Sequence, residues 1–110
     1  MRIQQLPASW LPTERLDIVA HLNSPLDALA RAGGFEVSRD DSDFPAFRYV
    51  HLMLDETYPF ALAEYDDAPG RIYVRAPARV EDPAGCVRLL LAALGLDEAA
   101  IVWTDESERQ

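Results

Sequence analysis

The alternation of apolar and polar residues predicts a set of strands in the middle of the chain. Residues 47–54 alternate between two sets that are both largely apolar, which predicts a central strand covered at least partly on both faces. Residues 35–39, 58–65 and 71–76 also alternate and predict three further strands. Short turns join the strands predicted at residues 47–54, 58–65 and 71–76, so we expect an antiparallel meander.

Apolar spacing and capping residues predict three helices. A stripe at helical spacing predicts a helix over residues 14–22, formed by Leu16, Val19 and Leu22. Ser24 and Pro25 suit the start of a second helix, which Gly33 and Gly34 would end, so residues 14–33 are expected to form two short helices or one kinked helix. Asp82 and Pro83 suit the start of a third helix, which extends to residue 94.

These elements predict an α+β fold. We expect an antiparallel four-stranded meander with an N-terminal helix pair and one C-terminal helix packed on it. The chain has 110 residues, so we expect a single domain over residues 1–110. Residues 1–12 look irregular, residues 100–103 could form a short final strand, and residues 104–110 are expected to be a mobile tail.

The negative charge of the chain is concentrated in this strand-rich region. The formal net charge is −9, and residues 36–67 hold nine acidic residues but only two arginines. A polyanionic surface repels nucleic acid and anionic lipid and attracts basic proteins. We therefore expect a basic protein partner, with no binding to nucleic acid or membranes, and a monomer or homodimer.

The length of the apolar runs and the single cysteine indicate where in the cell the protein acts. No apolar run approaches the ~20 residues that a membrane helix needs. A single cysteine, Cys86, cannot form an internal disulfide, so a reducing cytoplasm is the simplest expectation.

The sequence contains no recognisable metal, cofactor or catalytic motif. The acidic loop at residues 40–43 is followed by Phe44-Pro45 and lacks the glycine and the distal glutamate of a calcium loop. His21 and His51 are the only histidines, and their spacing does not suit a zinc site. We expect no enzyme activity and no cofactor, although a small enzyme that uses His51 with a nearby carboxylate is an open alternative.

The best candidates for function are acidic and tyrosine residues near the predicted turns. Tyrosines beside carboxylates are typical of a protein-binding surface, although charged turns and sheet tyrosines are also ordinary features of a soluble domain. The partner-binding candidates are Asp40, Asp41, Asp43, Asp55, Glu56, Glu64, Asp66 and Asp67, together with Tyr65 and Tyr73.

Part of the chain resembles a known family. Residues 60–65 and 69–74, the leucine-rich stretch 89–96 and Ile101-Val102-Trp103 together resemble small bacterial immunity proteins, which are encoded beside polymorphic toxins and inhibit them. The resemblance covers residues 47–103. It implies a cytoplasmic inhibitor whose acidic residues bind the basic active site, often that of a nuclease, of a cognate toxin.

A second resemblance is to type III secretion chaperones, which are small, acidic α/β proteins. It implies an adaptor that holds a non-globular segment along a sheet edge or an apolar groove. This chain is shorter than those chaperones and lacks room for their later strands and final helix.

Overall fold

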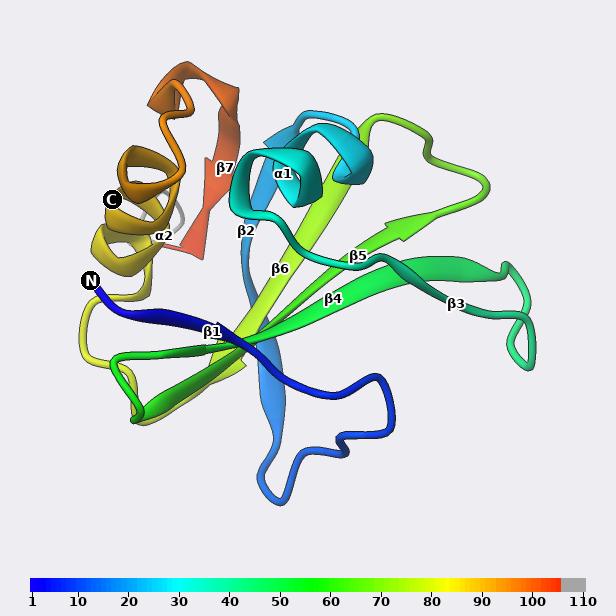
Figure 1. Cartoon of the computed structure of the whole chain (residues 1–110), viewed down its shortest axis with the longest axis horizontal. Helices are drawn as coiled ribbons and strands as arrows, with labels where there is room; N and C mark the ends of the chain where they lie inside the picture. The colour runs from blue at the N-terminus through cyan, green and yellow to red at the C-terminus, as the bar shows by residue number, and fades with distance from the viewer. Residues whose placement is uncertain (106–110) are drawn as a thin grey trace.

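A seven-stranded antiparallel sheet forms the centre of the structure, a computed structural model that describes residues 1–105 (Figure 1). The strand order is β1-β4-β5-β6-β2-β7, and β3 also pairs with β4. The strands are β1 (Ile3–Gln5), β2 (Leu16–Asn23), β3 (Ser38–Asp40), β4 (Phe47–Leu54), β5 (Tyr58–Tyr65), β6 (Arg71–Pro77) and β7 (Ile101–Thr104).

The short strands β1 and β3 lie along the same edge of β4. β1 pairs with residues 52–54, whereas β3 pairs with residues 47–49. The side-chain amide of Gln5 joins the two segments, because it donates to the carbonyl of Glu36 (2.7 Å) and accepts from its N–H (3.0 Å). The two short strands together therefore cover the edge that β4 would otherwise expose.

Both helices cover one face of the sheet. α1 (Leu26–Gly33) contacts β4 and β5, and α2 (Pro83–Ala93) contacts β2. Between helices and sheet lies a continuous core whose largest fully buried side chains include Phe60, Leu22, Leu26, Leu52 and Leu90. We call this side of the sheet the helix face and the other side the aromatic face.

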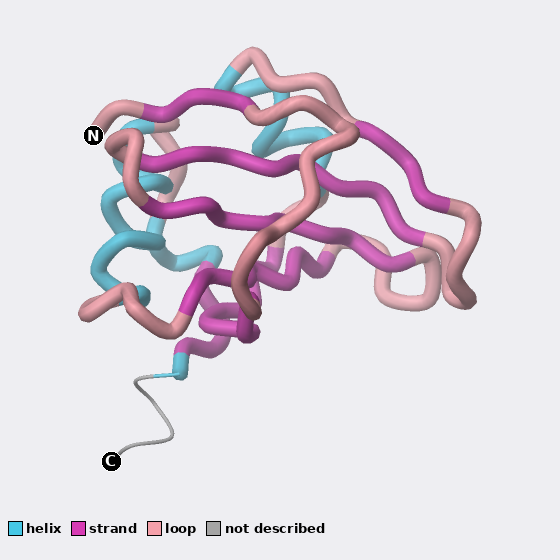
Figure 2. Tube along the Cα trace, turned by 90° about the horizontal axis from the view of Figure 1, so that it is seen from below, coloured by secondary structure: helices cyan, strands magenta, loops and turns pink. Residues whose placement is uncertain are grey.

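The segment between β1 and β2 crosses the aromatic face. Figure 2 shows this loop passing over the strands on the side away from the helices. The Tyr49 hydroxyl on β4 donates to the carbonyl of Ala8 (3.0 Å), which ties the loop to the sheet. Both faces of β4 are therefore partly covered, as its two apolar residue sets predicted.

The helix predicted over residues 14–22 is wrong, because this segment is strand β2 between β6 and β7. The register with β6 shifts between Ile18 and Ala20, so Val19 is an extra residue in a β-bulge. The bulge buries Val19 together with Ala20 and Leu22 and so produces a three-residue spacing that resembles a helical stripe. The adjacent β-branched Ile18 and Val19 are more typical of a strand.

The predicted fold class is corrected accordingly. Residues 1–105 form two α-helices and a seven-stranded sheet, not a four-stranded meander with three helices. β4 and β5 have the predicted bounds, and β6, α1 and α2 differ by one residue at one end. The strand predicted over 35–39 is reduced to β3, and β1 occupies part of the segment expected to be irregular.

The C-terminal expectation is also revised in part. Thr104 belongs to β7, pairs with Ala20 and is buried, so it is not part of a tail. Residues 106–110 lie outside the described residues. Over residues 1–105, neither helix has the length and apolar character needed to cross a membrane.

Enlarging Ala20 tests the placement of β2. Ala20 is fully buried beneath the helices, so Ala20→Leu should lower the free energy of unfolding by about 1–3 kcal/mol through overpacking. The matched change Ala28→Leu, on the exposed side of α1, should change it by less than about 0.5 kcal/mol. Urea denaturation measures both values, and a neutral Ala20→Leu would show that residue 20 does not face a closed core.

Candidate functional site

Five of the predicted acidic residues gather at one end of the sheet. Asp40 ends β3, Asp41 and Asp43 lie in the β3–β4 connection, and Asp66 and Asp67 lie in the turn after β5. The two connections are held together by the N–H of Asp66, which donates to the carbonyl of Ala46 (3.0 Å). We call these five carboxylates together with Phe44 the acidic tip.

Phe44 projects from the acidic tip into solvent. Its relative exposure is 102%, the largest among the large hydrophobic residues of the described chain. Asp43 precedes it, and Asp41, Asp43, Asp66 and Asp67 line a shallow hollow of about 360 Å³ beside it. An exposed phenyl ring costs solubility unless a partner covers it, and aromatic anchors are enriched at the centres of protein interfaces.

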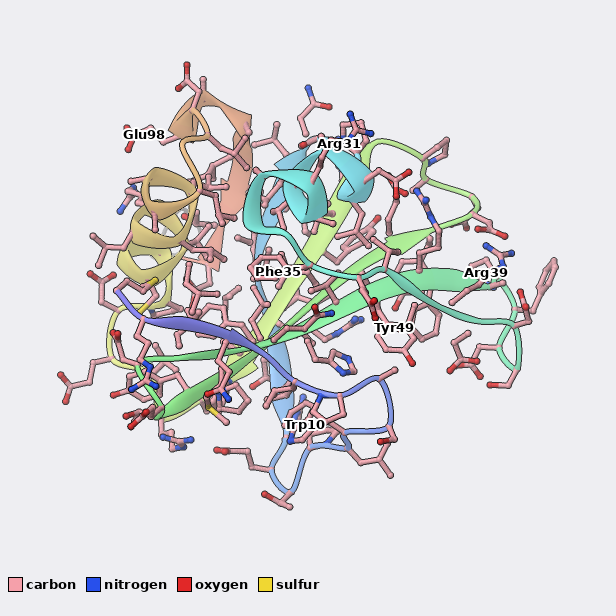
Figure 3. The ribbon with its side chains drawn as sticks, viewed as in Figure 1. Trp10, Arg31, Phe35, Arg39, Tyr49 and Glu98 are labelled. Atoms are coloured by element: carbon pink, nitrogen blue, oxygen red, sulfur yellow. The ribbon has the colours of Figure 1, made fainter. Side chains whose placement is uncertain are left out.

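Arg39 neutralises part of the acidic tip. Its guanidinium donates to both carboxylate oxygens of Asp66 (2.6 and 3.1 Å) and to Asp41 (2.7 Å). The pKa of Asp66 is held below its usual value, chiefly by this hydrogen bond from Arg39. Figure 3 shows Arg39 at this end of the sheet.

The other carboxylates of the acidic tip differ in their hydrogen bonds within the chain. Asp40 accepts from the hydroxyl (2.5 Å) and the N–H (2.8 Å) of Ser42, which lower its pKa. Asp43 and Asp67 are exposed and form neither an ion pair nor a hydrogen bond within residues 1–105. The tip therefore offers a partner two fully available carboxylates beside Phe44.

Asp55 and Glu56 lie at the opposite end of β4 and β5. Both have positive φ angles (52° and 59°), as the two central residues of a tight hairpin turn require. Asp55 accepts from the N–H of Arg2 (2.7 Å), and Glu56 is ion-paired with the Arg2 guanidinium (2.5 Å). These two acids therefore do not share a surface with the acidic tip, and both are engaged within the chain.

Glu64 lies on the helix face and is 4% exposed. Its carboxylate is paired with Arg48 and accepts from the N–H groups of Leu26 (3.3 Å) and Gly70 (3.0 Å). Arg48 is also paired with Asp27 in the first turn of α1 (2.8 Å). Glu64 thus caps α1 in place of Ser24, whose side chain makes no cap, and it is not available to a partner.

Tyr65 and Tyr73 belong to a continuous row of rings on the aromatic face. Adjacent ring centroids are 4.6–5.8 Å apart, within the range of favourable aromatic contacts. The row runs in the order Trp103, His21, Tyr73, Tyr65, Phe47, Tyr49, His51, Trp10. It crosses strands β7, β2, β6, β5 and β4 and ends at Trp10 in the covering loop.

The loop and the aromatic face line a half-open cavity of about 340 Å³. Trp10 packs on His51 with a centroid distance of 5.2 Å, and Figure 3 shows Trp10 on the side of the sheet that Tyr49 faces. The cavity is lined by Trp10, Pro12, Glu14, Arg15, Leu16, Phe47, Tyr49, His51, Ala61, Leu62, Ala63, Tyr65 and Arg75. It is the second candidate site of the molecule.

The histidines and the cysteine have structural surroundings. Burial lowers the pKa of both His21 and His51, so both imidazoles are neutral at pH 7. Burial, with Asp82 and Asp55 nearby, raises the pKa of Cys86 and makes its thiol less reactive. Within residues 1–105, no three His, Cys, Asp or Glu side chains are placed to share a metal ion.

The sequence interpretation missed Phe44 and the extent of the ring row. An aromatic residue between Asp43 and Pro45 in an otherwise polar loop is the signal that could have identified Phe44. The row could be found only in part, because Phe47, Tyr49 and His51 alternate along β4, but His21 and Trp103 reach it only through the sheet order.

Removing the charge of Glu64 tests its structural role. Glu64→Gln removes a charged partner of the half-buried Arg48 and weakens the cap of α1. The free energy of unfolding should therefore fall by about 3 kcal/mol. Glu56→Gln, which breaks an exposed pair with Arg2, should cost at most about 1 kcal/mol. Chemical denaturation of both variants gives the comparison, and similar small losses would contradict the role assigned to Glu64.

Comparison with known proteins found no match of any kind: no family model fits the chain, and neither a curated protein nor a solved structure is significantly similar to it. The acidic tip and the cavity on the aromatic face are therefore the two features from which a function can be inferred.

Proposed function

We propose that the protein is a non-enzymatic inhibitor, of the immunity-protein kind, that binds a basic protein through the acidic tip. The observation that carries the proposal is the fully exposed Phe44, which stands beside the unpaired carboxylates of Asp43 and Asp67. The partner-binding residues are thereby reduced to those of the acidic tip. The predicted residues Asp55, Glu56, Glu64, Tyr65 and Tyr73 lie outside it.

The charges of the tip act before contact. The tip has five carboxylates and one guanidinium, so it attracts a positively charged protein over roughly a Debye length, ~8 Å at physiological salt. Such complementarity raises the association rate more than it raises affinity. A basic active site, such as that of a nuclease, is the kind of surface that this field suits.

Phe44 acts after contact. Covering a fully exposed phenyl ring contributes about 1.5–3 kcal/mol, which corresponds to roughly 10–100-fold in affinity. The ring lies on a short connection anchored by Arg39 and by the Ala46–Asp66 hydrogen bond, so little ordering is needed when it binds. The half-buried lone thiol of Cys86 agrees with action in a reducing cytoplasm.

A pull-down from the source cell tests the proposal. The tagged protein should retain a basic protein, release it in high salt, and protect cells from it on co-expression. Asp43→Asn/Asp67→Asn should slow association at least tenfold, whereas Phe44→Ser should mainly speed dissociation, by about 10–100-fold. Stopped-flow fluorescence with the purified partner separates the two effects.

The matched control is Glu56→Gln/Glu98→Gln, which removes two exposed carboxylates away from the tip. It should leave association within about twofold of the wild type, since charges beyond a Debye length are screened. Equal slowing by the control, or a partner that is an unfolded segment held with little salt dependence, would overturn the inhibitor proposal and favour a chaperone-like adaptor.

A further inference from the structure

The cavity under the β1–β2 loop has a floor of small residues. Ala61 and Ala63 are the side chains that β5 presents to the aromatic face between Pro59 and Tyr65. Each lies between larger residues on the neighbouring strands: Ala61 pairs with His51 and Arg75, and Ala63 with Tyr49 and Tyr73. The missing side-chain volume at the centre of the face leaves the hollow of about 340 Å³, which is within the usual size of small-molecule sites.

The walls of this hollow suit a flat aromatic group. Phe47, Tyr49, His51 and Tyr65 line it from β4 and β5, and Trp10 closes it from the loop. Offset or edge contacts with such rings stabilise another aromatic ring beyond the burial of its area.

His51 contributes its ring to the hollow. Its Nδ1 atom is buried and has no hydrogen-bond partner among the described residues, and because it is closed to solvent it is not offered to a ligand. His51 and Arg75 flank Ala61 on the neighbouring strands, which sets their Cα atoms about 10 Å apart across the floor.

Arg75 gives the hollow a positive charge. Its guanidinium donates to the Tyr65 hydroxyl (3.2 Å), and within residues 1–105 it has no carboxylate partner. The other charged lining residues are neutralised, since Glu14 is paired with Arg79 (2.9 Å) and Arg15 with Asp17 (2.7 Å). The Arg75 guanidinium therefore retains donors that fit a carboxylate.

We propose that the hollow binds a small planar aromatic carboxylate, with its ring against the aromatic walls and its carboxylate on Arg75. The His51 imidazole, at the other wall, would pack against the ring of the ligand. The covering loop limits the space to a small molecule, and the overall negative charge disfavours a nucleic acid strand on this face. This site uses none of the residues of the acidic tip, so either proposal can fail without the other.

Titration with 2-naphthoate tests the proposal, with 2-naphthamide as the neutral analogue of the same shape. We expect 2-naphthoate to bind with a dissociation constant of about 1 mM or below, at least about tenfold more tightly than the amide, because its contact with Arg75 is charge-assisted. Calorimetry gives the affinities, and the methyl resonances of Ala61 and Ala63 should shift on binding. The absence of binding, or shifts confined to other parts of the molecule, would overturn the proposal.

Two variants and two controls identify the groups involved. Arg75→Gln should remove the preference for the carboxylate, whereas Arg71→Gln, on the same strand but outside the lining, should retain it. Ala61→Leu should fill the floor and weaken both ligands at least tenfold, whereas Ala78→Leu, at an exposed position after β6, should not. Arg75 is only half-buried, so its variant gives a decisive result even where Ala61→Leu impairs folding. An unchanged preference in Arg75→Gln would contradict the proposed contact.

Discussion

The alternation of side chains along β4, β5 and β6 determines the rest of this structure. Each residue of these strands belongs either to the helix face or to the aromatic face, because successive side chains point to opposite sides of a sheet. Glu64 and Arg48 share the helix face with Leu62 and Val50, so the buried Glu64 and the half-buried Arg48 form an ion pair beneath α1. Tyr65, one residue further along the chain, joins the ring row instead.

The same alternation separates the two candidate sites from the core. The helix face is filled mainly by apolar side chains, which form the core. The aromatic face has rings, an arginine and two alanines, and the loop above it covers it only in part. The acidic tip lies where these strands end, and the connections there are free to present charges and Phe44 because no neighbouring strand needs their side chains.

The sequence predicts the regular elements of this fold better than their arrangement. β4, β5 and α2 have strong local signals, in alternation and in the Asp82-Pro83 helix start, and their bounds were predicted to within one residue. The segment that forms β2 was misread because the bulge at Val19 imitates a helical spacing. Local pattern also could not show that β2 lies between β6 and β7, since that pairing joins residues far apart in the chain.

For the partner-binding site, the sequence predicted the kinds of residue involved but not which of them share a surface. Acidic residues and tyrosines were identified, but the sequence could not show that Glu64 faces the helices, because both residue sets of β4 are largely apolar and either could be the inner one. The predicted hairpin of residues 47–54 and 58–65 already implies that Asp55 and Glu56 lie at the opposite end from Asp66 and Asp67, although all four were assigned to one partner-binding set. Which of these acids are already bonded within the chain depends on contacts with Arg2, Arg39 and Arg48. These residues come together only in the folded chain.

The bulge at Val19 also fixes which residues of β2 face the helices. Ile18 and Ala20 pair with the consecutive β6 residues Arg75 and Val74, so Val19 stands outside the ladder. If Val19 took a regular place in the ladder while residues 20–22 kept their partners, Asp17 would turn toward the rings and Ile18 toward the helices, although no amino acid had changed. A natural variant that lacks residue 19 should therefore keep both pairings and lose only the buried Val19 side chain.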